Sequence, residues 1–197
     1  MSHTKYQTEG IVLGGYDFGE ANRYFNIFTK DFGLIGARAQ GIRELKSKLR
    51  YNLQDLSYSK ISLIRGRNAW KVTGAHEIKN ISKSFSNDSL KIQTSVRVLS
   101  FLRRMLSGEA RNDLLFDIII NGLSHLERDD LSEKDIGNLE ILLILRVLNN
   151  LGYLNSLGSF SDFIKSPLYD RDMLEGLEKV RVKAVKEINY SIEASQL

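Results

Sequence analysis

The sequence predicts an α+β protein in which a small five-stranded barrel over residues 1–80 is followed by an all-α helical bundle over residues 81–197. Apolar residues recur at about every second position before residue 80 and at about every 3.6 positions after it. Charge divides the chain at the same place. Residues 1–80 hold 13 Lys and Arg against seven Asp and Glu, a net charge of +6, whereas the remainder has a net charge of −2. A chain whose halves differ in this way favours two small domains over one.

Five short segments of the first 80 residues have the composition of β-strands and are separated by glycine or polar turns. In the third segment Ala37 and Ala39 alternate with Arg38, which places Arg38 on the opposite face. In the fourth, the apolar phase slips between Tyr58 and Ile61, as a β-bulge would cause. The five segments are residues 10–16, 24–29, 34–40, 56–65 and 68–73. Strands of this number and length predict a small closed barrel.

Four helices are predicted after residue 80 because apolar residues recur there at three- and four-residue steps. Ser132 followed by Asp135 resembles a capping box and opens the third helix, which extends to Leu151. This helix is apolar on nearly all sides, so we expect it to be the central helix of the bundle. The other helices are expected over residues 90–106, from Asn112 onward, and after Pro167.

The most basic part of the chain is residues 38–71, where nine Lys or Arg face only two acids, a net charge of +7. Tyr51, Tyr58 and Trp70 are interleaved with these cations. Lys and Arg displace the counterions condensed on a phosphate backbone, and aromatic rings offer a stacking face to unpaired bases. The segment therefore predicts a nucleic-acid surface. The alternative from charge alone is a solubilising surface that binds no nucleic acid.

Residues 41–50 are too polar for a strand, and they carry Arg43, Lys46, Lys48 and Arg50. We expect them to form a mobile basic loop over the barrel face. The alternative is an ordinary solvated connection.

Residues suited to covalent chemistry are scarce. The chain has no cysteine, which excludes disulfides and cysteine-ligated zinc. His3, His76 and His125 lie in different predicted elements, so neither a metal site nor a nucleophile–base pair is supported. Residues 36–41 have the spacing of a phosphate-binding loop, but Ile-Arg follows where Lys-Ser or Lys-Thr is required. We expect no enzyme activity, no catalytic residue, no cofactor and no metal.

The chain also shows no sign of membrane targeting. Residues 1–10 lack the apolar core of a signal peptide, and the longest apolar run, residues 141–145, ends at Arg146. With no cysteine, this composition suits a reducing cytoplasm.

Several segments, in order and spacing, resemble the bacterial RecO recombination-mediator family. They are EGIVL at residues 9–13, DFGEANR at 17–23, FTKDFG at 28–33, AQGIR at 39–43, KSKL at 46–49, and the run from Leu139-Glu140 to LGY at 151–153. Two departures stand out. Many members of that family carry a four-cysteine zinc motif after the region matching LGY, whereas residues 155–163 contain no cysteine, which excludes that zinc site. The chain is also shorter beyond this point than family members usually are.

The resemblance implies an oligonucleotide-binding (OB) fold barrel followed by an α-helical domain. It implies a bacterial, nucleoid-associated cytoplasmic protein that binds single- and double-stranded DNA and anneals complementary strands in recombinational DNA repair after DNA damage. It further implies docking on the C-terminal tail of the single-stranded-DNA-binding protein and, with RecR, help in loading RecA.

Charge and resemblance together predict a DNA-binding surface on the barrel. The expected phosphate contacts are Arg23, Arg38, Arg43, Lys46, Lys48, Arg50, Arg65, Arg67 and Lys71. The expected stacking residues are Tyr51, Tyr58 and Trp70, and for each of them the alternative is a place in the barrel core. Annealing would follow from the neutralisation of two repelling backbones on one basic surface.

The central helix offers a candidate groove for the acidic, hydrophobic-ended tail, lined by Leu142, Leu145, Arg146 and Asn149. The alternative is that neighbouring helices enclose this helix and that Arg146 pairs with an acid. The next place for the tail would then be Arg97, Arg103 and Arg104 on the first helix. A different class of function also stays open, namely a protein-interaction scaffold whose basic barrel binds acidic peptides and no DNA.

Overall fold

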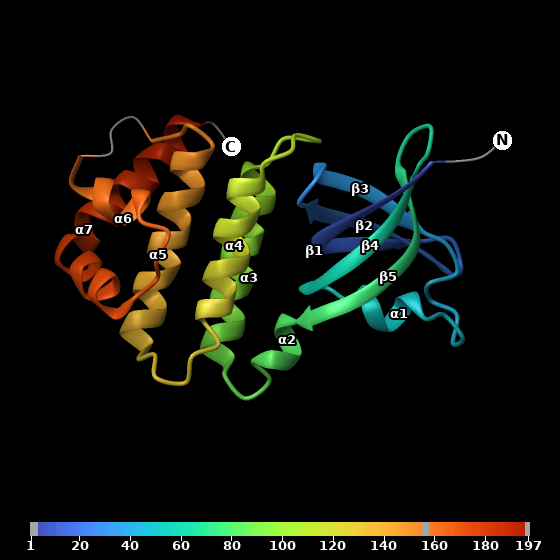
Figure 1. Cartoon of the computed structure of the whole chain (residues 1–197), viewed down its shortest axis with the longest axis horizontal. Coiled ribbons are helices and arrows are strands. Elements are labelled where there is room, and N and C mark those ends of the chain that lie inside the picture. The colour runs from blue at the N-terminus through green and yellow to red at the C-terminus, as the bar shows by residue number, and fades with distance from the viewer. Residues whose placement is uncertain (1–3, 155–157, 196–197) are drawn as a thin grey trace. The chain divides into compact units, whose positions relative to one another are not determined.

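The computed structural model describes residues 4–154 and 158–195. His3 and the first three residues of the segment 155–163 therefore lie outside the described residues. The chain divides into two compact units. One contains the residues up to Ser86 together with Leu106–Asp113, and the other contains Asn87–Met105 and the residues from Leu114 onward. Figure 1 shows the five strands in blue to green, the short helix of residues 49–52 in cyan, and the later helices in green to red.

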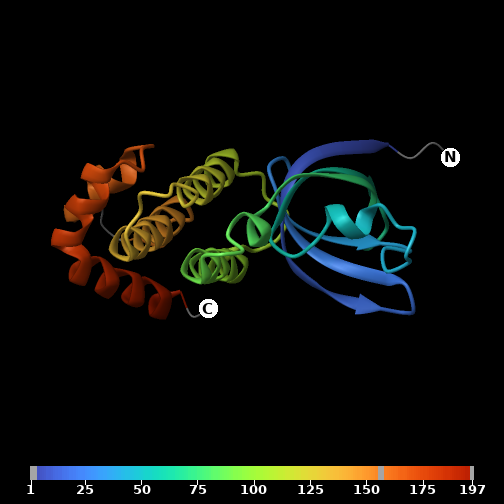
Figure 2. The ribbon, with the colours of Figure 1, turned by 90° about the horizontal axis from the view of Figure 1, so that it is seen from below.

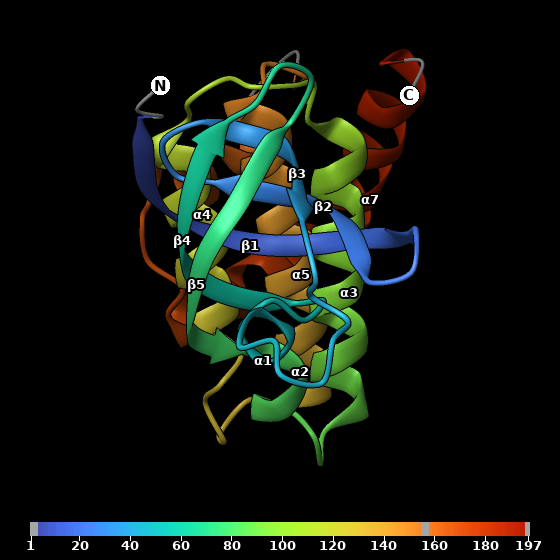
Figure 3. The ribbon, with the colours of Figure 1, turned by 90° about the vertical axis from the view of Figure 1, so that its right-hand side faces the viewer.

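The first unit is built on five strands, which confirms the predicted number. They are β1 (Lys5–Phe18), β2 (Asn22–Thr29), β3 (Gly33–Ala39), β4 (Ser57–Arg65) and β5 (Trp70–Asn80). Their order is β1-β2-β3-β5-β4, and pairing of β4 with β1 closes the barrel. Neighbouring strands are antiparallel except β3 and β5, which are parallel. In Figure 3, β4 and β5 run steeply across β1.

The core of the barrel follows from alternation along the strands. In β3, Ile35, Ala37 and Ala39 are buried, whereas Arg38 is exposed, as the sequence predicts. The small side chains of Ala37 and Ala39 leave room for larger ones from other strands, including Phe25, Ile27, Ile61 and Leu63. The charged members of the strands are thereby left on the outer surface.

The connector Leu106–Asp113 belongs to the barrel unit although helices of the other unit precede and follow it. β3 pairs with β5 only at Ala37 and Arg38, so the start of β3 is an edge. There the Leu34 amide donates to the Gly108 carbonyl at 3.2 Å. Gly33, at φ +68°, lies so close to the Ala110 backbone that a Cβ would overlap it. The connector thus covers an edge that β5 does not reach.

The longer helices of the second unit have bounds close to those predicted, and two short elements at residues 158–165 were not predicted. The elements of this unit are α3 (Ser89–Met105), α4 (Asp113–His125), α5 (Glu133–Asn150), the 3-10 turn η1 (Gly158–Phe160), α6 (Ser161–Lys165) and α7 (Arg171–Ala194). The capping box is confirmed, because the Asp135 amide donates to Ser132 Oγ at 3.2 Å and the Ser132 amide donates to Asp135 Oδ2 at 3.0 Å. α5 packs against α3 and α7, between which it lies in Figures 1 and 2. None of the described helices is both long enough and apolar enough to cross a membrane.

Candidate nucleic-acid interface

The twelve residues predicted to contact DNA all lie in the barrel unit. Eight of the nine cations are exposed, and Arg23 is half-buried. Arg38 of β3 and Lys71 of β5 are cross-strand neighbours on the outer face. The loop cations belong to residues 41–50, as predicted, and this segment contains no strand. A short helix, α1 (Leu49–Asn52), begins within its last two residues, so Arg50 is helical.

The structure brings three of the predicted arginines to one cavity of about 420 Å³. Its lining includes Arg23, Arg43 and Arg50 together with Asp17 and Asp55. Arg23 Nη2 donates to Asp55 at 2.9 and 3.1 Å, and Arg43 Nε lies 3.4 Å from Asp17 Oδ2. Two of these guanidinium groups thus already have carboxylate partners, which a phosphate would have to replace.

The basic loop is fastened to the barrel at its beginning. The Gly41 amide donates to Asn22 Oδ1 at 3.1 Å, and the Arg43 amide donates to the Ala21 carbonyl at 3.0 Å. Lys46 and Lys48, further along the loop, are exposed. We predicted a mobile loop, and the structure shows where its first residues are held.

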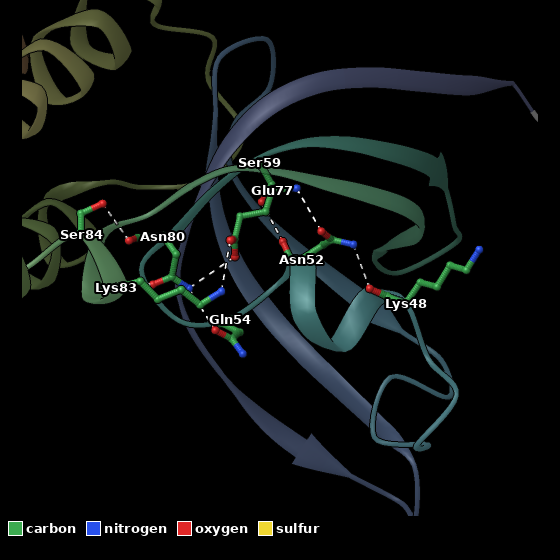
Figure 4. Close-up of polar contacts among 8 residues, drawn as sticks. All are labelled: Lys48, Asn52, Gln54, Ser59, Glu77, Asn80, Lys83 and Ser84. Carbon is green, nitrogen blue, oxygen red and sulfur yellow. Dashed lines mark hydrogen bonds and ion pairs between the residues drawn. The ribbon is translucent and has the colours of Figure 1, made fainter. Parts of the chain in front are cut away.

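Asn52, at the end of α1, fastens the other end of the basic loop (Figure 4). Its side chain donates to the Lys48 carbonyl at 2.9 Å and accepts from the Glu77 amide at 3.2 Å. Its main-chain carbonyl accepts from Ser59 Oγ at 2.7 Å. Asn80 continues the network, since its side chain donates to Gln54 at 3.0 Å. The loop therefore spans two fixed points on β4–β5 and on the β1–β2 turn.

The three predicted stacking residues have different environments. Tyr51 is 62% exposed. Tyr58 is half-buried, and its hydroxyl donates to the Glu9 carboxylate. Trp70 is only 3% exposed, so the prediction that it stacks on bases is wrong in this structure.

Trp70 is a core residue because the alternation of β5 points it inward with Val72. Its indole packs against the rings of Phe32 and Tyr6, with centroid distances of 4.9 and 5.4 Å. Its Nε1 donates to Glu109 Oε1 of the connector at 3.1 Å. Arg65 places its guanidinium 4.6 Å from the indole centroid and also pairs with Glu109. Arg65 is therefore already engaged by an acid.

The sequence prediction missed two aromatic residues on the outer face of the barrel. Tyr16 of β1 and Tyr24 of β2 are cross-strand neighbours, and their rings stack with centroids 5.1 Å apart. Tyr24 in turn lies beside Arg38. The signal in the sequence is Gly14-Gly15, because paired glycines inside a strand indicate a bulge that re-aims the following side chains.

The helical unit corrects the predicted tail groove. Leu142 and Leu145 have no exposed surface, so both are core residues and do not line a groove. Arg146 is 2% exposed, and it donates to two main-chain carbonyls and, at 3.5 Å, to Met173 Sδ. Its Nε and Nη2 donate to Phe163 O at 3.0 and 2.9 Å, and Nη2 donates to Leu168 O at 2.8 Å. The alternative that Arg146 pairs with an acid is also not what the described residues show.

Arg146 and Asn149 do line a cavity of about 540 Å³ within the helical unit. Apolar side chains from α4 and α6 and the ring of Tyr169 form much of its wall. The Arg146 guanidinium lies 4.2 Å from the Tyr169 ring centroid. Burial raises the pKa of the Tyr169 phenol, and the Arg146 charge opposes this rise. The cavity thus combines a buried cation with an apolar wall.

No cluster of three or more His, Cys, Asp or Glu side chains suited to a metal occurs within residues 4–154 and 158–195. The arrangement on the barrel offers cations and aromatic rings. Such groups are suited to binding by charge and stacking.

Comparison with known proteins identifies the family. The model of the family described as "Recombination protein O N terminal" matches residues 1–104. The "DNA repair protein RecO" of Thermodesulfovibrio yellowstonii is 33% identical over 150 residues, which cover 76% of this chain and 58% of that protein. The protein of the same name from Dehalococcoides mccartyi is 30% identical over 142 residues, or 71% of this chain and 54% of that protein.

A third relative, "DNA repair protein RecO" of Acetivibrio thermocellus, is 26% identical over 203 residues, which cover 95% of this chain and 79% of that protein. The chain spans little more than half the length of the first two relatives. The family model extends over more than half of the 197 residues and over every strand of the barrel. The chain therefore belongs to the RecO family.

Proposed function

We propose that this chain is a DNA-binding mediator of recombinational repair, without enzyme activity, whose barrel binds single- and double-stranded DNA. The observation that carries the proposal is the concentration of exposed cations on one compact unit. Residues 38–71 have a net charge of +7, and all nine of their cations except Lys60 are among the predicted phosphate contacts. Such a surface gains affinity for a polyanion by releasing counterions.

The barrel would suit this role as an oligonucleotide-binding (OB) fold. We infer this fold from the closed order β1-β2-β3-β5-β4 with a helix, α1, between β3 and β4. We assign DNA binding to residues 1–80 and partner contacts to the helical domain at residues 81–197. The phosphate contacts proposed are Arg23, Arg38, Arg43, Lys46, Lys48, Arg50, Arg65, Arg67 and Lys71, with Tyr51 and Tyr58 as stacking candidates.

Annealing would follow from neutralising two DNA backbones on the same surface, without nucleotide hydrolysis. RecR and, through it, RecA are proposed partners, and the protein is expected to act in the bacterial cytoplasm at the nucleoid. These partners rest on the family resemblance alone.

The proposed place for the tail of the single-stranded-DNA-binding protein is the cavity beside Arg146. The cavity is lined by the apolar side chains of Ile118 and Ile164, by the ring of Tyr169 and by the exposed cation Lys165. Apolar side chains of the tail would enter the cavity, and its carboxylates would meet Lys165 and Arg146. Lys165→Glu is expected to weaken binding of an acidic peptide ending in hydrophobic residues by about tenfold, because a charge-assisted contact becomes repulsive. Lys179 is an exposed cation on α7, so Lys179→Glu serves as the control and should leave peptide binding unchanged.

The proposed function is tested by fluorescence anisotropy with labelled single- and double-stranded oligonucleotides at several salt concentrations and with no partner protein. If the barrel is a nucleic-acid surface, oligonucleotides should bind tightly, and the logarithm of the association constant should fall steeply with the logarithm of the salt concentration. The scaffold alternative predicts that oligonucleotides do not bind while an acidic peptide does. Absence of oligonucleotide binding at low salt would overturn the proposal.

A further inference from the structure

The outer face of β1, β2 and β3 carries a stacked pair of tyrosines beside two exposed cations. Tyr16 pairs with Tyr24, Tyr24 with Arg38, and Arg38 with Lys71, so four side chains form one row across four strands. The two rings are nearly parallel, with an interplanar angle of 22°. Tyr16, at the end of the row, is 59% exposed. More than half of this side chain is therefore open to a ligand.

A β-bulge is what aims Tyr16 outward. Val12 pairs with Ile27 and Gly15 with Phe25, so two residues of β1 lie opposite the single residue Asn26. Without the extra residue, Tyr16 would share the inward face of Val12, which is fully buried. Gly15 permits the bulge, because a Cβ there would overlap the Tyr24 carbonyl oxygen.

Tyr24 is held flat against the barrel by a second glycine. Its hydroxyl lies over Gly36 of β3, in the space that a Cβ on Gly36 would occupy. The bare backbone of β3 thus supports the Tyr24 ring, and Tyr24 supports the Tyr16 ring. Tyr16 is the outer ring of the pair, so it can be removed while Tyr24 keeps its contact with Gly36.

Arg38 is placed on the same face by a third ring. Its guanidinium lies 5.8 Å from the centroid of Phe18, which is in the same strand as Tyr16. Arg38 and Lys71 are exposed, and neither forms an ion pair with an acid among the described residues. Two cations without carboxylate partners therefore stand beside an open aromatic face.

We propose that Tyr16 and Tyr24 form a base-stacking platform that makes the barrel prefer unpaired nucleotides over duplex DNA, with Arg38 and Lys71 holding the adjacent phosphates. A base in a duplex is stacked on both sides and has no free face, whereas an unpaired base does. Stacking on a ring also tolerates any base, so the platform gives strand selectivity without sequence selectivity. The inference rests on the proposed DNA binding and adds a substrate preference to it.

The competing explanation is that the tyrosine pair only stabilises the sheet. Cross-strand aromatic pairs do stabilise antiparallel strands. That role would appear as a lower melting temperature and as an equal loss of affinity for every DNA. A binding platform would appear as a selective loss for single strands with the salt dependence unchanged, because every phosphate contact is kept.

The experiment measures anisotropy with labelled oligothymidylate and with a hairpin duplex of equal charge, for wild type, Tyr16→Ala, Tyr16→Leu and Tyr16→Phe. Tyr16→Leu keeps an apolar contact with Tyr24 but offers no ring. We expect Tyr16→Ala and Tyr16→Leu to weaken oligothymidylate binding about tenfold, the loss typical of one base–aromatic stack, and duplex binding less than about twofold. Tyr16→Phe should match wild type. Tyr190→Ala removes a tyrosine that is 57% exposed on the helical unit and should change neither affinity.

Each other outcome decides against the platform. Equal losses on both substrates, or no loss on either, would overturn it while leaving the proposed DNA binding intact. A melting temperature that falls with Tyr16→Ala but is restored by Tyr16→Leu, with selectivity unchanged in both, would assign the pair to sheet stability. A wild-type protein that binds neither oligonucleotide would overturn the proposed function and the platform together.

Discussion

The outer face of the barrel and the interior of the helical unit use the same kind of side chain in opposite ways. Arg38 lies exposed on β3, where its charge stays hydrated and available to a ligand. Arg146 lies inside the helical unit, 2% exposed, with three hydrogen bonds to the carbonyls of Phe163 and Leu168. The number of cations in a segment therefore does not reveal which of them are available to bind ligands.

The difference has an energetic basis. An exposed cation contributes little to folding, since water already solvates it. A buried guanidinium has lost that water, so it must be compensated by acceptors, and those acceptors depend on it in return. Arg146 thereby ties α5 to α6 and to the segment between α6 and α7.

The largest expected effect separates these two arginines. Arg146→Ala should lower the free energy of unfolding by about 3–5 kcal/mol, because it removes a buried side chain and leaves the carbonyls of Phe163 and Leu168 without its hydrogen bonds. Arg38→Ala should change it by less than about 0.5 kcal/mol. Urea unfolding followed by far-UV circular dichroism measures both. Equal effects of the two substitutions would contradict the comparison.

The bulge that aims Tyr16 outward can be tested at its glycine. Gly15→Ala should destabilise the barrel by about 1–3 kcal/mol, because the new Cβ overlaps the Tyr24 carbonyl oxygen. Gly74→Ala is the matched control, since a Cβ there would lie 3.6 Å from Ser62, an ordinary contact. Trp70 is the single tryptophan and lies in the barrel core, so its fluorescence reports on this unit. If Gly15→Ala leaves the free energy of unfolding unchanged, the bulge does not lie at Gly15.

The basic loop can be compared with cations of the helical unit at equal charge. Replacing Arg43, Lys46, Lys48 and Arg50 together by Ala should make the slope of log affinity against log salt shallower by roughly one unit for each phosphate that the loop no longer neutralises. Arg43 already pairs with Asp17, so its share should be the smallest. Replacing Arg103, Lys179, Lys183 and Lys186 removes the same charge from the other unit.

Stability should change little in the loop variant, because these cations are exposed. If the two quadruple variants lower affinity and slope equally, total charge and not the loop governs binding. That result would leave the barrel without a defined DNA contact.

Acid should destabilise the helical unit, and this is the smallest expected effect. Burial, and secondarily the charge of Arg128, lower the pKa of His125 below its ordinary value of 6.5. Arg128 also lowers the pKa of Asp130 to about 2, mainly through its hydrogen bond. Both groups therefore have a lower pKa in the folded protein than in the unfolded chain. The stability that each group adds is fully present above its unfolded pKa and is lost as the pH falls through its folded pKa.

The expected result is a fall in melting temperature in two windows. One begins below pH 6.5 and belongs to His125, and the other lies between pH 3.8 and about 2 and belongs to Asp130. His125→Gln should flatten the first window and leave the second. Identical melting profiles of wild type and variant between about pH 7 and 5 would show that His125 does not contribute.

Local pattern predicted most of the architecture. Alternation in residues 34–40 indicated β3 and the outward position of Arg38, and the change of period after residue 80 indicated the helices. The capping box at Ser132 marked the start of α5. The clustering of cations in residues 38–71 identified the barrel as the charged unit. All of these depend on neighbours along the chain, which is why one sequence is sufficient to read them.

The tertiary structure alone decided which of those side chains are available. Tyr16 points outward because a bulge shifts β1 by one residue against β2, and a shift of one residue exchanges the two faces of a strand. Alternation in β5 points Trp70 inward, but the acceptor for its buried indole nitrogen is the connector residue Glu109, 39 positions later. Arg146 is buried because carbonyls 17 and 22 residues away accept its hydrogen bonds. The sequence thus determined the elements and their charge, whereas exposure and pairing were decided by contacts between distant segments, which periodicity does not encode.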